Sequence, residues 1–370
     1  MHIAIAGTRG IPASYSGFET SVEETTTRFV RDGHKVRVYC RRNRTGKTRS
    51  STDGIQTVFT PYLPGKYTET FTHTLFSVLH LALRRVETVQ LYGAGNGWFV
   101  PILRLLGFRV VFLTDGFDWK RQKWGAVAKS FLKGGSKVGS TFANISVVDS
   151  RHVLQSLERM FPKGRFCYIP YGARITHTSG RGGLTSLNLR EREYFLFVGR
   201  FVPEKNVDLL IQAFNSANTR MKLVLVGGNA YDPSYETNLR ALACERVVFP
   251  GFVFGNQYEE LLAGCYAYIQ PSFLEGTSPS LLAAMGAGAC VLVSDIPENR
   301  ETVSEAGFFF ESGDLSSLKR MLEHISENPV LVGAKRKEAL KRAAEEYSWE
   351  VVSQRLLDVS CGTSKGVPSP

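Results

Sequence analysis

The sequence predicts an α/β protein built from two doubly wound domains that face each other across a cleft. Short apolar runs alternate with helical patterns along most of the 370 residues. Most of these runs are β-branched or aromatic and lack polar alternation, as parallel strands buried on both faces do. The alternation is interrupted at residues 174–193 and then restarts. Two consecutive series of this kind predict two parallel sheets, each covered by helices.

The N-terminal domain is predicted over residues 1–173, as a Rossmann-like unit. Helical patterns over Phe18–Asp32, Thr70–Arg85 and Ala126–Lys137 separate its strands. The predicted strands are His2–Ala6, Lys35–Cys40, Val89–Tyr92, Arg109–Thr114, Asn144–Asp149 and Phe166–Pro170.

A second Rossmann-like domain is predicted over residues 194–346, after a linker at 174–193 that is rich in Gly, Ser, Thr and charge. A terminal helix at 347–360 and a disordered tail at 361–370 complete the chain. Ligands of such sheets bind beyond the carboxyl ends of the strands, so the functional residues are expected in the loops that follow them. The predicted strands are Tyr194–Val198, Lys222–Val226, Val247–Phe249, Ala267–Gln270, Cys290–Ser294 and Phe308–Phe310.

Composition excludes several classes of protein. With 43% hydrophobic and 21% charged residues, the chain is globular rather than disordered, collagenous or coiled-coil. No uncharged apolar run reaches the roughly 18 residues of a membrane-spanning helix, and the start MHIAIAGTRG is too short for a signal peptide. We therefore expect an intracellular, cytoplasmic protein. Six scattered cysteines without a CxxC pair argue against zinc and against a disulfide framework.

Positive charge is concentrated in the first half of the chain. Residues 1–172 carry 25 Lys/Arg and 11 Asp/Glu, whereas residues 173–370 carry 20 and 23. This asymmetry, within a net charge of +11, indicates an anionic partner such as nucleic acid, a membrane or a phosphorylated substrate. A solvated basic face that serves solubility alone is the alternative.

The first predicted strand leads into the segment GTRGIPASYSGFET, which opens a helix. Backbone N–H groups and the helix dipole attract phosphate at such a position, although the same glycines also suit a plain tight turn. The segment matches neither GxGxxG nor GxxxxGKS/T. This mismatch argues against a nicotinamide-dependent oxidoreductase and against a P-loop enzyme.

A stronger chemical signal follows the predicted strand Tyr194–Val198, in the segment GRFVPEKN. Arg200 and Lys205 lie at the carboxyl end of that strand. A guanidinium grips phosphate oxygens bidentately and an ammonium adds a point charge, so together they could stabilise a departing diphosphate without a metal. The alternative is a pair of surface cations beside Glu204 and Asp208.

A carboxylate precedes a second predicted helix N-terminus, in the segment FLEGTSPSLLAAM at 273–285. Ser278 and Pro279 mark the start of that helix, and Glu275 comes just before it. Amides that bind phosphate beside a carboxylate that binds sugar hydroxyls suit a sugar diphosphate. No DxD-type carboxylate pair occurs in a suitable loop, so the sequence does not require a divalent metal.

Together these motifs resemble family 4 glycosyltransferases with the GT-B fold. The resemblance rests on Gly199-Arg200-x4-Lys205, VGG at 226–228, PGFV at 250–253 and EGTSPSLL at 275–282. The opening GTRGIPASYSGFET, DGFDWKR at 115–121 and IPYG at 169–172 are similar to the bacterial rhamnosyltransferase-like subgroup that serves surface-polysaccharide assembly. The resemblance covers about residues 1–355, and the terminal helix resembles one that crosses back onto the first domain.

The resemblance implies retaining transfer of a sugar, with rhamnose as one candidate, from a nucleoside-diphosphate sugar to a polysaccharide or lipid-linked acceptor. Neither a metal nor a cofactor is implied. Arg200 and Lys205 would hold the donor diphosphate, Glu275 would touch the sugar ring, and Asp115 would lie near the reacting sugar; these four are the implied catalytic residues. The implied donor-binding residues are Gly17, Gly199, Gly228, Phe252, Val253, Gly276, Thr277 and Ser278.

Two positions depart from the family pattern. Ser16 replaces the first glycine of a pair, and Ala283 replaces a second glutamate that contacts the nucleotide ribose. Since a deoxyribose donor lacks the 2′-hydroxyl, Ala283 favours a thymidine-diphosphate sugar. Two other functions stay open: a catalytically weak partner subunit that binds nucleotide sugar or glycan, and a nucleotide-sugar epimerase on the same fold.

The acceptor side is expected in the first domain, where cations and aromatics interleave. Such a stretch suits a lipid-diphosphate acceptor or an anionic membrane, with the protein peripheral at its inner face; a core helix with a solvated face is the alternative. No recognisable nucleic-acid motif supports a nucleic-acid partner. The candidate residues are Trp119, Lys120, Arg121, Lys129 and Lys133, continuing to Lys137.

Overall fold

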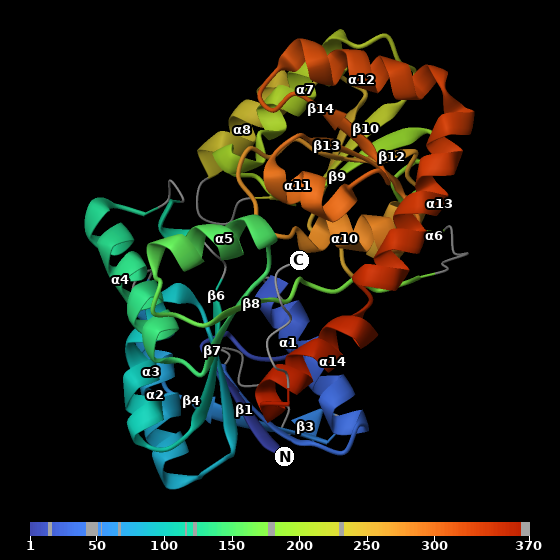
Figure 1. Ribbon diagram of the computed structural model, residues 1–370. Helices are drawn as coiled ribbons and strands as arrows, with labels where there is room; N and C mark the ends of the chain where they lie inside the picture. Colours follow the sequence, from blue (N-terminus) through green and yellow to red (C-terminus); the bar gives the residue numbers. More distant parts are fainter. Residues whose placement is uncertain are drawn as a thin grey trace. The chain divides into compact units, whose positions relative to one another are not determined.

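The computed structural model describes residues 1–13, 17–41, 51–52, 54–65, 68–114, 117–120, 124–176, 182–228 and 233–363. The chain forms two compact units (Figure 1). Unit 1 comprises Met1–Tyr171 together with the chain from Trp349 onward, and unit 2 comprises Gly172–Ser348. Both units are α/β, as predicted.

Unit 1 is built on an eight-stranded sheet in the order β3-β4-β2-β1-β5-β6-β7-β8, parallel except for β3 against β4. The six predicted strands are all present, with end shifts of at most two residues, whereas β3 and β4 were not predicted. The strands are β1 (His2–Ala6), β2 (Lys35–Arg41), β3 (Ser51–Thr52), β4 (Ile55–Thr60), β5 (Thr88–Tyr92), β6 (Arg109–Thr114), β7 (Ile145–Val148) and β8 (Phe166–Tyr168).

Helices cover both faces of this sheet. One core joins the sheet to α2, η1 and α3, through residues such as Val78, Phe99 and Leu103. The core on the other face joins it to α1 and α14, through residues such as Val22 and Leu356. The helices of unit 1 are α1 (Gly17–Arg31), α2 (Glu69–Leu83), η1 (Ala94–Phe99), α3 (Val100–Leu105), η2 (Asp118–Lys120), α4 (Ala126–Phe142), α5 (Arg151–Met160) and α14 (Trp349–Cys361).

The terminal helix α14 belongs to unit 1, although it follows unit 2 in the sequence. Its Glu350 forms an ion pair with Arg28 of α1 at 2.8 Å. Near its end, Ser360 accepts hydrogen bonds from Thr88 through its carbonyl and from Gln90 through its hydroxyl, both at 2.9 Å. Polar contacts at both ends and a buried apolar face therefore fix α14 on this sheet.

Unit 2 is built on a six-stranded parallel sheet in the order β11-β10-β9-β12-β13-β14. All six strands were predicted. They are β9 (Tyr194–Arg200), β10 (Lys222–Gly228), β11 (Val247–Gly251), β12 (Ala267–Gln270), β13 (Cys290–Ser294) and β14 (Phe308–Phe310). The helices of unit 2 are α6 (Gly182–Ser186), η3 (Pro203–Lys205), α7 (Val207–Ser216), α8 (Pro233–Leu242), α9 (Gly255–Gly264), α10 (Pro279–Gly286), α11 (Pro297–Val303), α12 (Leu315–Glu327) and α13 (Pro329–Glu346).

The predicted linker at 174–193 is folded in part. Residues 182–193 belong to unit 2 and contain helix α6, whose Leu184 is buried, as is Leu189 after it. The Gly183 amide donates to the Glu260 carboxylate on α9 at 2.6 Å. The two leucines are too few to give a visible apolar period, but their burial anchors the segment to unit 2.

Candidate functional site

The predicted phosphate-binding residues of unit 2 lie at the carboxyl edge of its sheet, where β9 and β10 end together. Gly199 and Arg200 stand in register with Gly227 and Gly228. Gly227 has φ +132°, and a Cβ there would lie 1.8 Å from the carbonyl oxygen of Gly199. Only glycine therefore permits this approach of the two strands. The Arg200 side chain is exposed at the same edge.

The loop after β11 reaches the same edge. A Cβ at Gly228 would lie 3.1 Å from the Phe252 ring, so this ring covers the end of β10. Phe252 is 57% exposed and stacks on Phe254, which is 69% exposed. Val253, between them, is half-buried. The structure thus brings Phe252 beside Gly228, both of which the sequence marked as donor-binding.

Lys205 and Glu275 form an ion pair, although 70 residues separate them. Their side chains are only 16% and 10% exposed. A backbone hydrogen bond of 3.2 Å from the Phe273 amide to the Glu204 carbonyl joins the two loops that carry them. An ammonium and a carboxylate so shielded from water interact more strongly than a surface pair does.

Helix α10 begins where the sequence predicts, directly after this pair. Ser278 is its N-cap and accepts from the Leu281 amide, and Pro279 occupies the first turn. Ser280 accepts a 3.0 Å hydrogen bond from the hydroxyl of Tyr268, whose burial raises its pKa and keeps it a donor. Beside Glu275, Gly276 is half-buried, and Thr277 and Ser278 are buried.

Ala283 lies one turn into α10, on its less buried side. It is half-buried, as is Ser280, whereas Leu282 and Ala284 are fully buried. A longer side chain at position 283 therefore has a direction in which to extend. Position 283 is therefore not on the fully buried side of α10.

A buried polar network beneath the Glu275 loop was not predicted. Asn299 donates to the Ser294 carbonyl and to its hydroxyl, each at 3.0 Å, and accepts from Gln270 at 2.9 Å. Ser294 in turn donates to the Ser272 carbonyl, in the loop itself. Sequence could have pointed to it only through Gln270, a polar residue at the end of an apolar strand.

The candidate residues of unit 1 are only partly described. Asp115 and Arg121 lie outside the described residues, as does Ser16, and Gly17 is the first residue of α1. Lys120 places its ammonium 3.8 Å from the centre of the Phe117 ring. On α4, Lys129 is half-buried, and Lys133 is exposed.

Trp119 corrects one expectation. Its ring is 7% exposed and packs in a core with Val148, Leu157 and Phe161, beneath α5. The indole is therefore not available to an acceptor or a membrane surface. The ring packs against the end of β7 and against α5. The sequence around position 119 does not show this packing, because these elements are distant along the chain.

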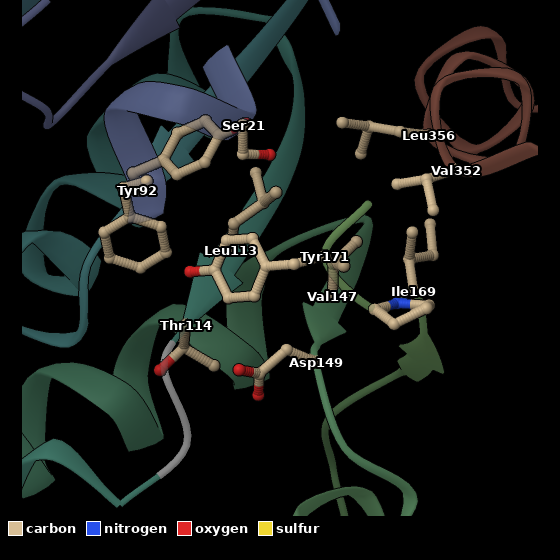
Figure 2. A pocket seen from close by; sticks show the side chains of 12 residues that line it. Ser21, Tyr92, Leu113, Thr114, Val147, Asp149, Ile169, Tyr171, Val352 and Leu356 are labelled. Carbon is tan, nitrogen blue, oxygen red and sulfur yellow. The ribbon is translucent and has the colours of Figure 1, made fainter. Parts of the chain in front are cut away.

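Unit 1 has a small cavity of about 30 Å³ at the carboxyl edge of its own sheet (Figure 2). Thr114 ends β6, and Asp149 follows β7; both side chains face the cavity, with Tyr92 and Tyr171 beside them. The buried Thr114 hydroxyl has no hydrogen-bond partner among the described residues. The volume suits about one water molecule. Asp149 was missed as a candidate because it was predicted as the last residue of the strand Asn144–Asp149, whereas β7 ends at Val148.

Among the described residues, no group of three or more His, Cys, Asp or Glu side chains is placed to hold a metal ion. In the same part of the chain, no helix combines the length and the apolar character needed to cross a membrane.

Family models match both units. A model described as "Glycosyl transferase 4-like domain" matches residues 16–172, and one described as "Glycosyl transferases group 1" matches residues 186–347. Among solved structures, sucrose-phosphate synthase from Thermosynechococcus elongatus is 20% identical with a TM-score of 0.85, over 98% of both chains. Anabaena HepE in complex with UDP-glucose is 16% identical with a TM-score of 0.79, over 98% of this chain and all of that one.

Curated relatives match part of the chain. The O-antigen chain mannosyltransferase B of Escherichia coli is 27% identical over 177 residues, 45% of each protein. An N-acetylgalactosaminyltransferase of Campylobacter jejuni, named for N,N'-diacetylbacillosaminyl-diphospho-undecaprenol, is 27% identical over 46% of this chain and 45% of its own. The chain thus spans about half the length of the curated relatives it matches. Both units thus match glycosyltransferase domain models, and the chain has the GT-B fold.

Proposed function

We propose that this protein transfers a sugar from a nucleoside-diphosphate donor to a lipid-linked or polysaccharide acceptor, with retention at the anomeric carbon and without a metal. The observation that carries the proposal is the shielded pair of Lys205 and Glu275, at the sheet edge where Arg200 is exposed. The leaving diphosphate gains negative charge as the glycosidic bond breaks. Two cations at this edge stabilise that charge more in the transition state than in the ground state.

The same edge supplies the other groups that a sugar nucleotide needs. Phe252 offers an exposed ring and backbone for the base, and α10 begins beside Glu275, whose carboxylate can accept hydrogen bonds from sugar hydroxyls. Anabaena HepE was crystallised with UDP and with UDP-glucose, which supports a nucleotide-sugar donor.

The donor nucleotide is proposed to be thymidine diphosphate, which leaves rhamnose a candidate for the sugar. Ala283 is half-buried on α10, and its methyl group cannot accept a hydrogen bond from a ribose hydroxyl. A hydrogen bond to a charged group contributes roughly 1.5–3 kcal/mol. A deoxyribose donor, which has no 2′-hydroxyl, loses less from the absence of a glutamate than a UDP- or GDP-sugar does.

The acceptor is proposed to be lipid-linked. Lys133 and Lys137 are exposed on α4 of the basic unit 1, which suits a lipid diphosphate at an anionic membrane. The Campylobacter jejuni relative is named for an undecaprenol diphosphate, which supports this class of acceptor.

The experiment is incubation with a panel of nucleotide sugars and a polyprenyl-diphosphate sugar acceptor, with EDTA present. We expect release of nucleoside diphosphate together with a glycosylated lipid whose anomeric configuration matches that of the donor, measured by NMR. Release that depends strictly on Mg²⁺ or Mn²⁺ would contradict the role of the two cations. Nucleotide binding without release from any donor would identify a partner subunit instead, and donor release without a modified acceptor would mean hydrolysis.

A further inference from the structure

The outward side of helix α2 is apolar over its last three turns. Leu75, Phe76, Leu79 and Leu83 are 37%, 38%, 54% and 83% exposed. Positions 75, 76, 79 and 83 share one helical face, and the exposed residue Ala82 extends it. The inward side is mixed: Val78 and Leu81 pack in the core of unit 1, beside the buried polar residues His73, Thr74 and Ser77. Over these turns the outward side of α2 is therefore the more apolar of the two.

Helix α3 also carries exposed apolar side chains. On α3, Ile102 is 45% exposed and Leu105 is 88% exposed. Helices α2 and α3 cover the same face of the sheet, with α4 beside them (Figure 1). Of the 18 large apolar side chains that are exposed in the described part of the chain, ten lie between residues 75 and 142. Such concentration marks an interaction surface, since isolated exposed leucines would be spread over both units.

Charge around this surface is predominantly positive. Between residues 70 and 148 the sequence has ten Lys/Arg and three Asp/Glu. Arg84 and Arg85 are exposed directly after α2, and Arg104 is exposed between the two apolar residues of α3. Helices α3 and α4 have no acidic residue. Cations therefore outnumber carboxylates beside the apolar side chains, although Glu87 is exposed after α2 and Glu69 of α2 pairs with Arg41.

We propose that this α2–α3 face docks on an anionic lipid bilayer. The leucines enter the boundary between headgroups and acyl chains, while Arg84, Arg85 and Arg104 contact lipid phosphates. A second copy of the chain fits less well, because an isologous contact would bring the same cations together. The inference deepens the proposed function, since a lipid-linked acceptor resides in a bilayer, and it moves the docking surface from α4 to α2 and α3.

The test is cosedimentation of the full chain with phosphatidylcholine vesicles that contain phosphatidylglycerol, at low salt. Replacing Leu79 and Leu83 by Glu should weaken vesicle binding by about tenfold or more. Arg84→Gln with Arg85→Gln should weaken it roughly fivefold per charge and lessen its salt dependence. Val330→Glu, at an 88% exposed apolar position of unit 2, is the matched control and should bind as wild type does.

Three results would overturn the inference: no vesicle binding by wild type, equal losses in the Leu79/Leu83 variant and in the control, or a wild-type dimer that this variant converts to a monomer. The last result would identify a second copy as the occupant. Nucleotide titration checks that each variant is folded. Release of nucleoside diphosphate with a water-soluble acceptor analogue tests the proposed function separately, because it requires no bilayer.

Discussion

Lys205 and Glu275 allow catalysis to be separated from stability. Their ion pair is 16% and 10% exposed, so Lys205→Met removes a cation and leaves a largely shielded carboxylate without it. If the ammonium stabilises the departing diphosphate, turnover falls by about 10²–10³-fold, the scale observed when a preorganised charge-stabilising group is removed.

The effect on folding is smaller and follows from the residual exposure of the pair. Breaking a fully buried ion pair costs about 3–5 kcal/mol, and an exposed pair contributes at most about 1 kcal/mol. For this partly screened pair we expect a loss of about 1–3 kcal/mol in unfolding free energy. A second change, Glu275→Gln, removes the unpaired charge. The double variant should therefore return to within about 1 kcal/mol of wild type, while its turnover stays low.

Urea unfolding measures the free energy of unfolding, and nucleoside-diphosphate release measures turnover. Lys319→Met is the matched control, because Lys319 pairs with Glu323 at 3.9 Å on helix α12, and both side chains are more accessible than those of the Lys205 pair. It should change stability by less than about 0.5 kcal/mol and leave turnover unchanged. Recovery of both stability and turnover in the double variant would show that Lys205 only neutralises Glu275, and would refute its catalytic role.

Three other substitutions test the donor site and the fold. By calorimetry, wild type should bind dTDP more tightly than UDP or GDP, and Ala283→Glu should strengthen UDP more than dTDP; a wild-type preference for UDP or GDP would end the thymidine proposal. Gly227→Ala should lower unfolding free energy by about 2–4 kcal/mol, because its Cβ would lie 1.8 Å from the Gly199 carbonyl oxygen at φ +132°; a Tm within experimental error of wild type would contradict this packing. Burial lowers the pKa of His73 to about 4, so the folded state favours the neutral side chain. The contribution of His73 to the free energy of unfolding is therefore complete above pH 6.5 and declines by up to about 3 kcal/mol as the pH falls toward 4. His73→Gln should flatten that part of the stability profile, and an unchanged slope would show that other groups cause it.

The strands were predictable because burial on both faces requires continuous apolar runs. Strands β1, β6, β12, β13 and β14 match their predicted bounds. Strand β4 was missed, since its sequence IQTVFT places polar residues among the apolar ones and lies at the edge beside β3. The sequence could predict that Lys205 and Glu275 lie near each other, because both follow strands that end at one edge of the sheet; it did not predict their ion pair.

Side-chain direction was not predictable from the same patterns. Trp119 lies among cations in the sequence, yet its ring is buried in a hydrophobic cluster with residues of β7 and α5. Helix α2 has apolar residues on both sides, so periodicity predicts a helix but not which leucines face outward. The network of Gln270, Ser294 and Asn299 depends on three elements that meet only in the folded unit.

The central claim is that two cations of unit 2, and no metal, stabilise the leaving diphosphate. Its most direct test is single-turnover transfer from the preferred nucleotide sugar in the presence of EDTA, comparing wild type with Arg200→Ala. Arg200 is exposed at the end of β9, so its loss should leave folding intact. We predict full wild-type turnover with the chelator and a fall of about 10²–10³-fold in the variant. Wild-type turnover abolished by EDTA, or an Arg200→Ala variant that turns over at the wild-type rate, would contradict the claim.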